Sequence, residues 1–72
     1  MAKPEGMEMG KRLTTRQVSE RTGVPEETLR WWRAEGRGPR SFNIGRKVFY
    51  LDDDCDEWER QQYENTVRGG AA

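Results

Sequence analysis

The first periodic stretch of the chain reads LTTRQVSERTGV. Thr14 is followed three residues later by Gln17, the spacing of a capping box, in which two side chains satisfy free backbone N–H groups at a helix start. This pattern predicts a short helix from Thr15 to Thr22, with Gly23 forming the left-handed turn that ends it. The positions expected to face inward are Leu13, Val18 and Val24.

A second helix is predicted directly after this turn. Pro25 suits the first turn of a helix, and the two acidic residues that follow it favour the positive end of the helix dipole. The helix is expected to run to about Glu35, with Gly36 closing it. Two helices joined by a tight turn at residues 23–24 form a helix-turn-helix motif.

Two short β-prone runs, SFNI and VFY, come next and are separated by Gly45-Arg46-Lys47. This order predicts a small hairpin with a basic tip. Alternation along the two runs predicts strands with one half-buried face. The residues of that face are Phe42, Ile44, Val48 and Tyr50.

A third helix is predicted in LDDDCDEWERQQYENTV, with Asp52 or Asp53 as its cap. One face, expected to pack on the first two helices, carries Leu51, Cys55, Trp58 and Gln62. The predicted fold is mainly α with a small β-hairpin wing, in a single domain. Residues 12–64 form that domain, a winged helix-turn-helix, between a disordered arm (1–11) and a disordered tail (65–72).

The adjacent tryptophans of the second helix cannot both face the core, because consecutive helix residues point about 100° apart. With Leu29 at the centre of the buried face, Trp32 lies on the same side and Trp31 on the opposite side. We therefore expect Trp32 in the core and Trp31 at the surface. The alternative is that the hairpin or the third helix folds over Trp31.

Composition excludes several classes of protein. The 72 residues include one Cys and no His, so they offer no internal disulfide, no Cys/His zinc cluster and no histidine base. No glycine-rich phosphate loop precedes a helix, and no apolar run approaches membrane-spanning length. We expect a soluble cytoplasmic protein that is not an enzyme and needs no metal or cofactor.

The zero net charge conceals an uneven distribution. Residues 11–50 carry ten Lys or Arg and four Glu, a net +6, whereas residues 51–72 carry two Arg and seven acids, a net −5. A basic middle beside an acidic end indicates one face for nucleic acid and another for water or a protein. The alternative is that internal salt bridges neutralise the two segments.

From Leu13 to Trp58 the chain resembles the small winged helix-turn-helix domains of phage excisionases and AlpA-type regulators. These share the DNA-binding architecture of MerR-type regulators. The resemblance covers about 46 of 72 residues, and its most specific part is GVPEETLRWW. A Gly-Arg-basic wing and a late Trp complete the pattern.

The resemblance implies that the second helix enters the major groove of DNA, that the start of the first helix holds a phosphate, and that the wing contacts the backbone or the minor groove. Arg33, beside Trp31, is placed to reach a phosphate or a guanine edge. The expected DNA-binding residues are Thr15, Arg16, Glu26, Glu27, Thr28, Arg30, Trp31, Arg33, Arg46 and Lys47.

The chain departs from the family pattern at Arg21 and Thr22, where apolar residues are usual. The first helix is therefore expected to be loosely packed. The chain also ends about 14 residues after Trp58, too soon for the long dimerisation helix and sensor domain of MerR-type regulators. An effector-sensing regulator is therefore not expected.

The first functional hypothesis is an excisionase, which binds repeated DNA sites head to tail, bends the DNA and directs a phage tyrosine integrase toward excision in the bacterial host cell. The second is a small AlpA-type transcriptional regulator on the same fold. A third, from another class, is a protein-interaction module or antitoxin that uses Trp31 as an anchor.

Overall fold

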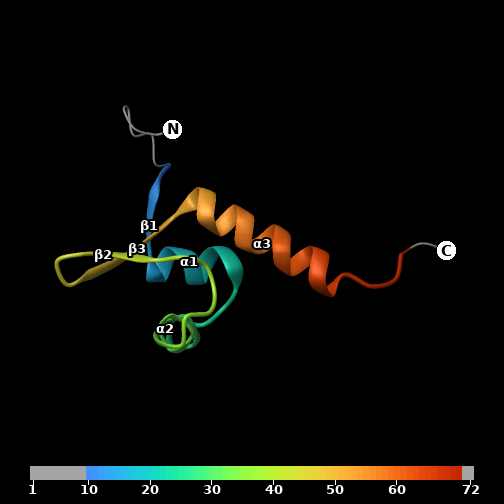
Figure 1. The fold of residues 1–72 in the computed structure, drawn as a ribbon, viewed down its shortest axis with the longest axis horizontal. Coiled ribbons are helices and arrows are strands. Elements are labelled where there is room, and N and C mark those ends of the chain that lie inside the picture. Colours follow the sequence, from blue (N-terminus) through green and yellow to red (C-terminus); the bar gives the residue numbers. More distant parts are fainter. Residues whose placement is uncertain (1–9, 71–72) are drawn as a thin grey trace.

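The computed structural model describes residues 10–70, and over these residues the chain forms three helices and a three-stranded antiparallel sheet (Figure 1). The predicted N-terminal arm lies outside the described residues except for its last two positions. The elements in chain order are β1 (Arg12–Thr14), α1 (Thr15–Thr22), α2 (Glu26–Ala34), β2 (Phe42–Ile44), β3 (Lys47–Leu51) and α3 (Asp52–Thr66). This is the winged helix-turn-helix architecture predicted from the sequence.

The capping box of α1 is present in full. The backbone N–H of Gln17 donates to the Thr14 hydroxyl at 3.1 Å, and the backbone N–H of Thr14 donates to the Gln17 side chain at 2.8 Å. At the other end, Gly23 has φ 81° and donates its N–H to the Ser19 carbonyl at 2.8 Å. The chain then turns sharply, so that α2 is seen nearly end-on in Figure 1 while α1 lies across the view.

The helix α2 ends at Ala34, one residue before the predicted end, with Glu35 as its cap. The N–H of Arg37 donates to the Trp32 carbonyl at 2.7 Å, which folds the chain back after the helix. Gly36 takes φ 75° in this turn, a conformation that favours glycine. The turn delivers the chain to the start of β2.

The strand β1 was not predicted from the sequence. It pairs antiparallel with the central strand β3, with Leu13 opposite Tyr50, while β2 pairs with the other edge of β3. Three residues are too short for a recognisable alternation, so this strand is defined by its partner and not by its own pattern. The result is that the start of the domain is bonded to its last strand.

The cap predicted for α3 is wrong. Leu51 holds the N-cap position, and no side chain caps the helix. Asp52 is instead the first helical residue, and its carboxylate accepts the backbone N–H of Lys11 at 3.0 Å. Its own N–H donates to the Lys11 carbonyl at 2.9 Å. The pairing of β1 therefore extends to the start of α3. The Asp52 carboxylate binds Lys11 in this pairing and does not cap the helix.

The hairpin has a shorter tip than predicted. Gly45, with φ 61°, and Arg46 form the turn, and Lys47 already belongs to β3. In Figure 1 this end of the hairpin projects beyond the helices.

The prediction that one face carries Phe42, Ile44, Val48 and Tyr50 is wrong. Phe42 lies opposite Phe49 and Ile44 opposite Lys47, so Val48 and Tyr50 point to the other face of the sheet. Ile44 is 46% exposed.

The core contains four fully buried side chains, and α1, α2, β3 and α3 contribute one each. They are Val18, Leu29, Tyr50 and Cys55. Leu13, Val24, Trp32 and Val48 pack around them. The burial of Cys55 confirms its expected packing role.

The two tryptophans lie as predicted. The ring of Trp32 packs against Trp58, with 5.8 Å between ring centroids, whereas 56% of Trp31 is exposed. Gln62, expected on the packed face of α3, is exposed. The second half of α3 extends away from the core (Figure 1), and two of the residues placed in the predicted tail, 65 and 66, belong to this helix.

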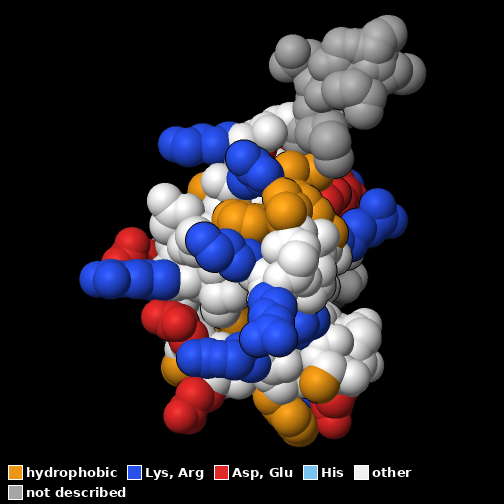
Figure 2. All heavy atoms as spheres, turned by 90° about the vertical axis from the view of Figure 1, so that its left-hand side faces the viewer, with side chains coloured by type: hydrophobic (Ala, Val, Ile, Leu, Met, Phe, Trp, Pro, Cys, Tyr) orange, Lys and Arg blue, Asp and Glu red, His pale blue; other side chains and the backbone are white. Residues whose placement is uncertain are grey.

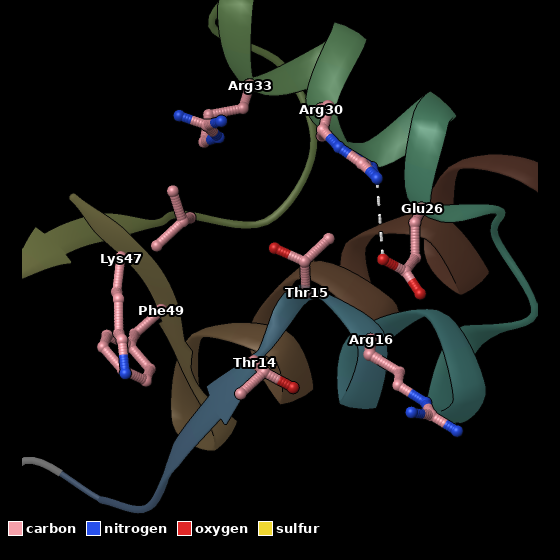
Figure 3. A pocket seen from close by; sticks show the side chains of 9 residues that line it. Thr14, Thr15, Arg16, Glu26, Arg30, Arg33, Lys47 and Phe49 are labelled. Carbon is pink, nitrogen blue, oxygen red and sulfur yellow. Dashed lines mark ion pairs between the residues drawn. The ribbon is translucent and has the colours of Figure 1, made fainter.

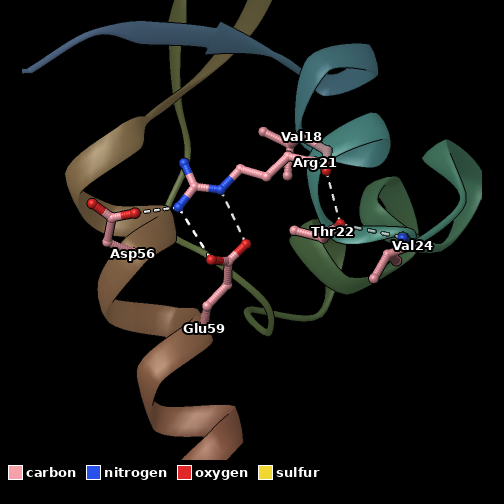
Figure 4. Close-up of polar contacts among 6 residues, drawn as sticks. All are labelled: Val18, Arg21, Thr22, Val24, Asp56 and Glu59. Carbon is pink, nitrogen blue, oxygen red and sulfur yellow. Dashed lines mark hydrogen bonds and ion pairs between the residues drawn. The ribbon is translucent and has the colours of Figure 1, made fainter.

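The two residues of α1 that depart from the family pattern both have polar partners. Arg21 reaches across to α3, where its guanidinium pairs with Asp56 and, at 3.0 Å, with Glu59 (Figure 4). The Thr22 hydroxyl donates to the Val18 carbonyl at 2.8 Å and accepts the Val24 N–H at 3.2 Å. Both polar residues therefore have defined partners where apolar packing is usual.

Truncating the two tryptophans should have opposite consequences for stability. Trp32→Ala should lower the free energy of unfolding by about 3 kcal/mol, because it removes a ring packed against the core. Trp31→Ala should cost less than about 1 kcal/mol, the value of an exposed cation–π contact. Urea unfolding followed by circular dichroism measures both. Comparable losses in the two variants would contradict this assignment of faces.

The bridge from Arg21 to α3 should be measurable by a double-mutant cycle with Glu59. The hydrogen bonds that Arg21 donates to Glu59 and to Asp56 raise the pKa of Arg21 further above its already high ordinary value, so the guanidinium stays charged. Because the partners remain partly exposed, we expect a coupling energy of only about 0.5–1 kcal/mol. High salt should weaken the coupling. A coupling of zero at low salt would show that the contact contributes nothing to stability.

Stability should fall in alkaline solution. Burial raises the pKa values of Tyr50 and Cys55 above their ordinary values of 10.0 and 9.0. The unfolded chain therefore releases these protons first, and rising pH above about 9 favours unfolding. Urea midpoints between about pH 7 and 11 test this, with Tyr50→Phe and Cys55→Ala removing one contribution each. A midpoint independent of pH in the wild-type protein would refute the prediction.

Candidate nucleic-acid interface

A groove of about 510 Å³ lies between the start of α1, one side of α2 and the strand β3 (Figure 3). Three separate segments form its walls, so it exists only in the folded chain. The lining residues are Thr14, Thr15, Arg16, Glu26, Arg30, Arg33, Lys47, Val48 and Phe49. Six of the ten residues expected from the sequence to bind DNA are among them.

The spacing of residues along α2 explains why this side of the helix faces the groove. Glu26, Arg30 and Arg33 are four and three residues apart, so they fall on one stripe of the helix. Leu29, which is fully buried, anchors the neighbouring stripe in the core. The packing of Leu29 thus turns the charged stripe toward β3 and α1.

The groove is strongly basic because its cations are incompletely neutralised. Arg30 forms a long ion pair with Glu26 at 3.7 Å, and Arg16 pairs with the exposed Glu20 at 3.3 Å. Within residues 10–70, Arg33 has no ion-pair partner, and its buried Nε donates no hydrogen bond. A buried N–H without an acceptor is costly, so an acceptor brought by a ligand would be stabilising there.

The wing adds basic side chains next to the groove. Arg46 and Lys47 are exposed at the turn and at the start of β3. Figure 2 views the end of the molecule that carries the wing, and it shows Lys and Arg side chains gathered on this face around exposed hydrophobic side chains. On the sheet, the guanidinium of Arg12 lies 5.3 Å from the ring centroid of Phe49. Groove and wing thus form one basic surface.

Four expected site residues do not line the groove. Arg46 is at the wing tip, Glu27 and Trp31 are exposed on α2, and Thr28 is partly buried. Trp31 stacks with Arg37, whose guanidinium carbon is 4.8 Å from the ring centroid. No local pattern indicates this partner, because Arg37 follows the helix and reaches Trp31 only through the turn after it.

The sequence also missed three lining residues: Thr14, Val48 and Phe49. The sequence pattern indicates only a wing strand for Val48 and Phe49, and only a helix cap for Thr14. Their place in the groove follows from the pairing of β1 with β3, in which Thr14 lies opposite Phe49. A strand of three residues carries too little pattern to reveal this pairing.

The ion pairs decide how far the acidic and basic segments neutralise each other. Among residues 10–70, Arg21 is the only basic side chain of the middle segment that pairs with an acid of α3. Arg60 instead pairs within α3, with Glu57 and Glu64, and it lowers the pKa of Glu57. Internal pairing therefore leaves most of the basic surface available for an external anion.

Two other features are absent from the part of the chain that the structure describes. Its His, Cys, Asp and Glu side chains form no group of three or more that could hold a metal ion. None of its helices has the length and apolar character needed to cross a lipid bilayer.

Comparison with known proteins agrees with the fold. A family model described as a helix-turn-helix domain matches residues 12–63, from the first residue of β1 to the last full turn of α3. No curated protein and no solved structure matches the chain. Helix-turn-helix domains bind DNA by placing their second helix in the major groove. The matched model covers well over half of the chain, which therefore belongs to the helix-turn-helix domain family, with DNA as its partner.

Proposed function

We propose that the protein is an excisionase, which binds directly repeated DNA sites side by side, bends the DNA and directs a phage tyrosine integrase toward excision. The observation that carries the proposal is a basic groove and wing on one very small domain. Such a module contacts few base pairs, so its specificity alone is limited. A row of contacting copies gains effective concentration and shares the cost of bending.

The groove suits one strand of the duplex. With α2 in the major groove, Arg30 points from the groove side of the helix toward base edges or phosphates. Arg33 and Lys47, which have no ion-pair partner within residues 10–70, flank the path of the backbone. Thr15 and Arg16 lie at the positive end of α1, where an anion is favoured. The wing tip at Arg46 then reaches the backbone or the adjacent minor groove.

Contacts between neighbouring copies are proposed to run from the wing of one copy to α3 of the next. The wing is basic and has an exposed apolar side chain, Ile44. The helix α3 is acidic, and beyond the core it exposes Tyr63 by 66%, followed by Val67 exposed by 50%. Opposite charges and apolar side chains on two different surfaces suit a head-to-tail contact, which continues along DNA without closing into a ring.

Removing the wing cations should weaken binding to all DNA sequences. With Arg46 and Lys47 both replaced by Ala, the slope of log affinity against log salt should become shallower by about two, close to one per lost phosphate contact. Fluorescence anisotropy on a duplex with a single site measures this. The variant with Ala at Arg60 and Arg68 has the same change in net charge away from the groove and should retain the wild-type slope. An unchanged slope in the wing variant would exclude the wing from the interface.

The excisionase role is tested by selecting binding sites from a random duplex library at about 0.1 M salt. We expect short sites enriched as direct repeats, because head-to-tail copies keep one orientation along the duplex. Inverted pairs would refute the excisionase and favour a dimeric AlpA-type regulator. Absence of any enrichment would refute both and direct attention to Trp31 as a protein-binding anchor.

A further inference from the structure

Among the nine residues that line the groove, Glu26 is the only acid. Its carboxylate lies 3.7 Å from the guanidinium of Arg30, and the two side chains keep 42% and 53% of their surface exposed. Figure 3 shows the pair at one end of the groove, with Arg33 farther along the same helix. A negative charge therefore lies where the phosphates of DNA must approach.

The stability of α2 does not require a carboxylate at this position. An exposed ion pair between residues four apart contributes little to folding, and Glu27 also supplies a negative charge to the start of the helix. For binding to the DNA backbone, the Glu26 carboxylate is unfavourable, because it repels phosphate and partly neutralises Arg30. We therefore look for its role in the recognition of DNA.

The length of the ion pair supplies that explanation. At 3.7 Å the two groups attract each other without a close hydrogen bond, in contrast to the 2.8 Å pair of Arg60 with Glu64. Arg30 is therefore held near Glu26 but can still turn its N–H groups toward another acceptor. A guanine edge offers two neutral acceptors, whereas a phosphate brings a full negative charge toward Glu26.

We propose that Glu26 is a specificity-determining residue, whose carboxylate disfavours phosphate contacts by Arg30 and reserves Arg30 for a guanine edge. The inference rests on the site-specific DNA binding proposed above. Glu26 lowers affinity for all DNA, and it lowers affinity for random DNA more than for the correct site. In a genome with many competing sites, the ratio of specific to random affinity determines how well a protein finds its site.

The experiment compares wild-type protein with Glu26→Gln by anisotropy on two duplexes. One is the best single site from the selection, and the other has the same composition in scrambled order. Glu26→Gln should bind the scrambled duplex about five-fold more tightly, and its salt slope there should steepen by about one as Arg30 takes a phosphate. The ratio of specific to scrambled affinity should fall by a similar factor.

Two further variants separate this role from simple removal of a negative charge. Glu64→Gln removes the carboxylate of another Glu–Arg pair four residues apart, on α3, changes the net charge equally and should leave both affinities as in wild type. In an Arg30→Ala background, Glu26→Gln should give little gain on scrambled DNA. An equal gain with and without Arg30, or an equal gain in the Glu64→Gln variant, would overturn the inference.

The outcomes also separate this inference from the proposed function. If wild-type protein binds both duplexes equally, site-specific binding fails and the role of Glu26 fails with it. If wild-type protein discriminates between the duplexes and Glu26→Gln discriminates equally well, only the role of Glu26 is refuted. Thermal unfolding of each variant verifies that the compared proteins are folded.

Discussion

The fold depends on four buried side chains that come from four different elements. Val18, Leu29, Tyr50 and Cys55 meet in one cluster, so each of α1, α2, β3 and α3 contributes a single fully buried residue to the core. A domain this small buries only about 60% of the surface that its unfolded chain exposes. There is consequently little redundancy, and the orientation of each helix relies on very few contacts.

Because the core is so small, polar contacts also connect the elements. The Arg21 bridge joins α1 to α3, and the backbone bonds between Lys11 and Asp52 join the start of the domain to α3. Neither contact involves the groove. The charges that stabilise the fold are therefore separated from most of the charges that face DNA, and the basic surface stays largely uncompensated without loss of the scaffold that presents it.

The sequence was sufficient wherever a local pattern determines structure. The capping box at Thr14, the turn at Gly23 and the opposite faces of the two tryptophans depend on residues a few positions apart, and each was predicted. The strand β1, the reassigned carboxylate of Asp52 and the partner of Arg21 depend on residues about 35 to 40 positions apart. No local sequence pattern distinguishes those residues from solvent-exposed ones.

The same distinction between local and long-range patterns applies to the candidate site. The spacing of the α2 residues and the basic wing tip were readable, and the groove includes six of the residues expected there. The groove itself, with Val48 and Phe49 in its wall, exists only because β3 lies between β1 and β2. The lack of an ion-pair partner for Arg33 within residues 10–70 could not be predicted from the sequence either, because it depends on which acidic side chains the fold places near it.

The single thiol of the chain has a practical consequence. Cys55 is fully enclosed by the core, so a thiol-specific reagent can reach it only when the cluster opens. The rate of modification then measures how often the helices separate, at one known position and without any added label. DNA that holds α2 in place should slow that rate. The rate of Cys55 modification would then report DNA binding at the surface from a position in the core.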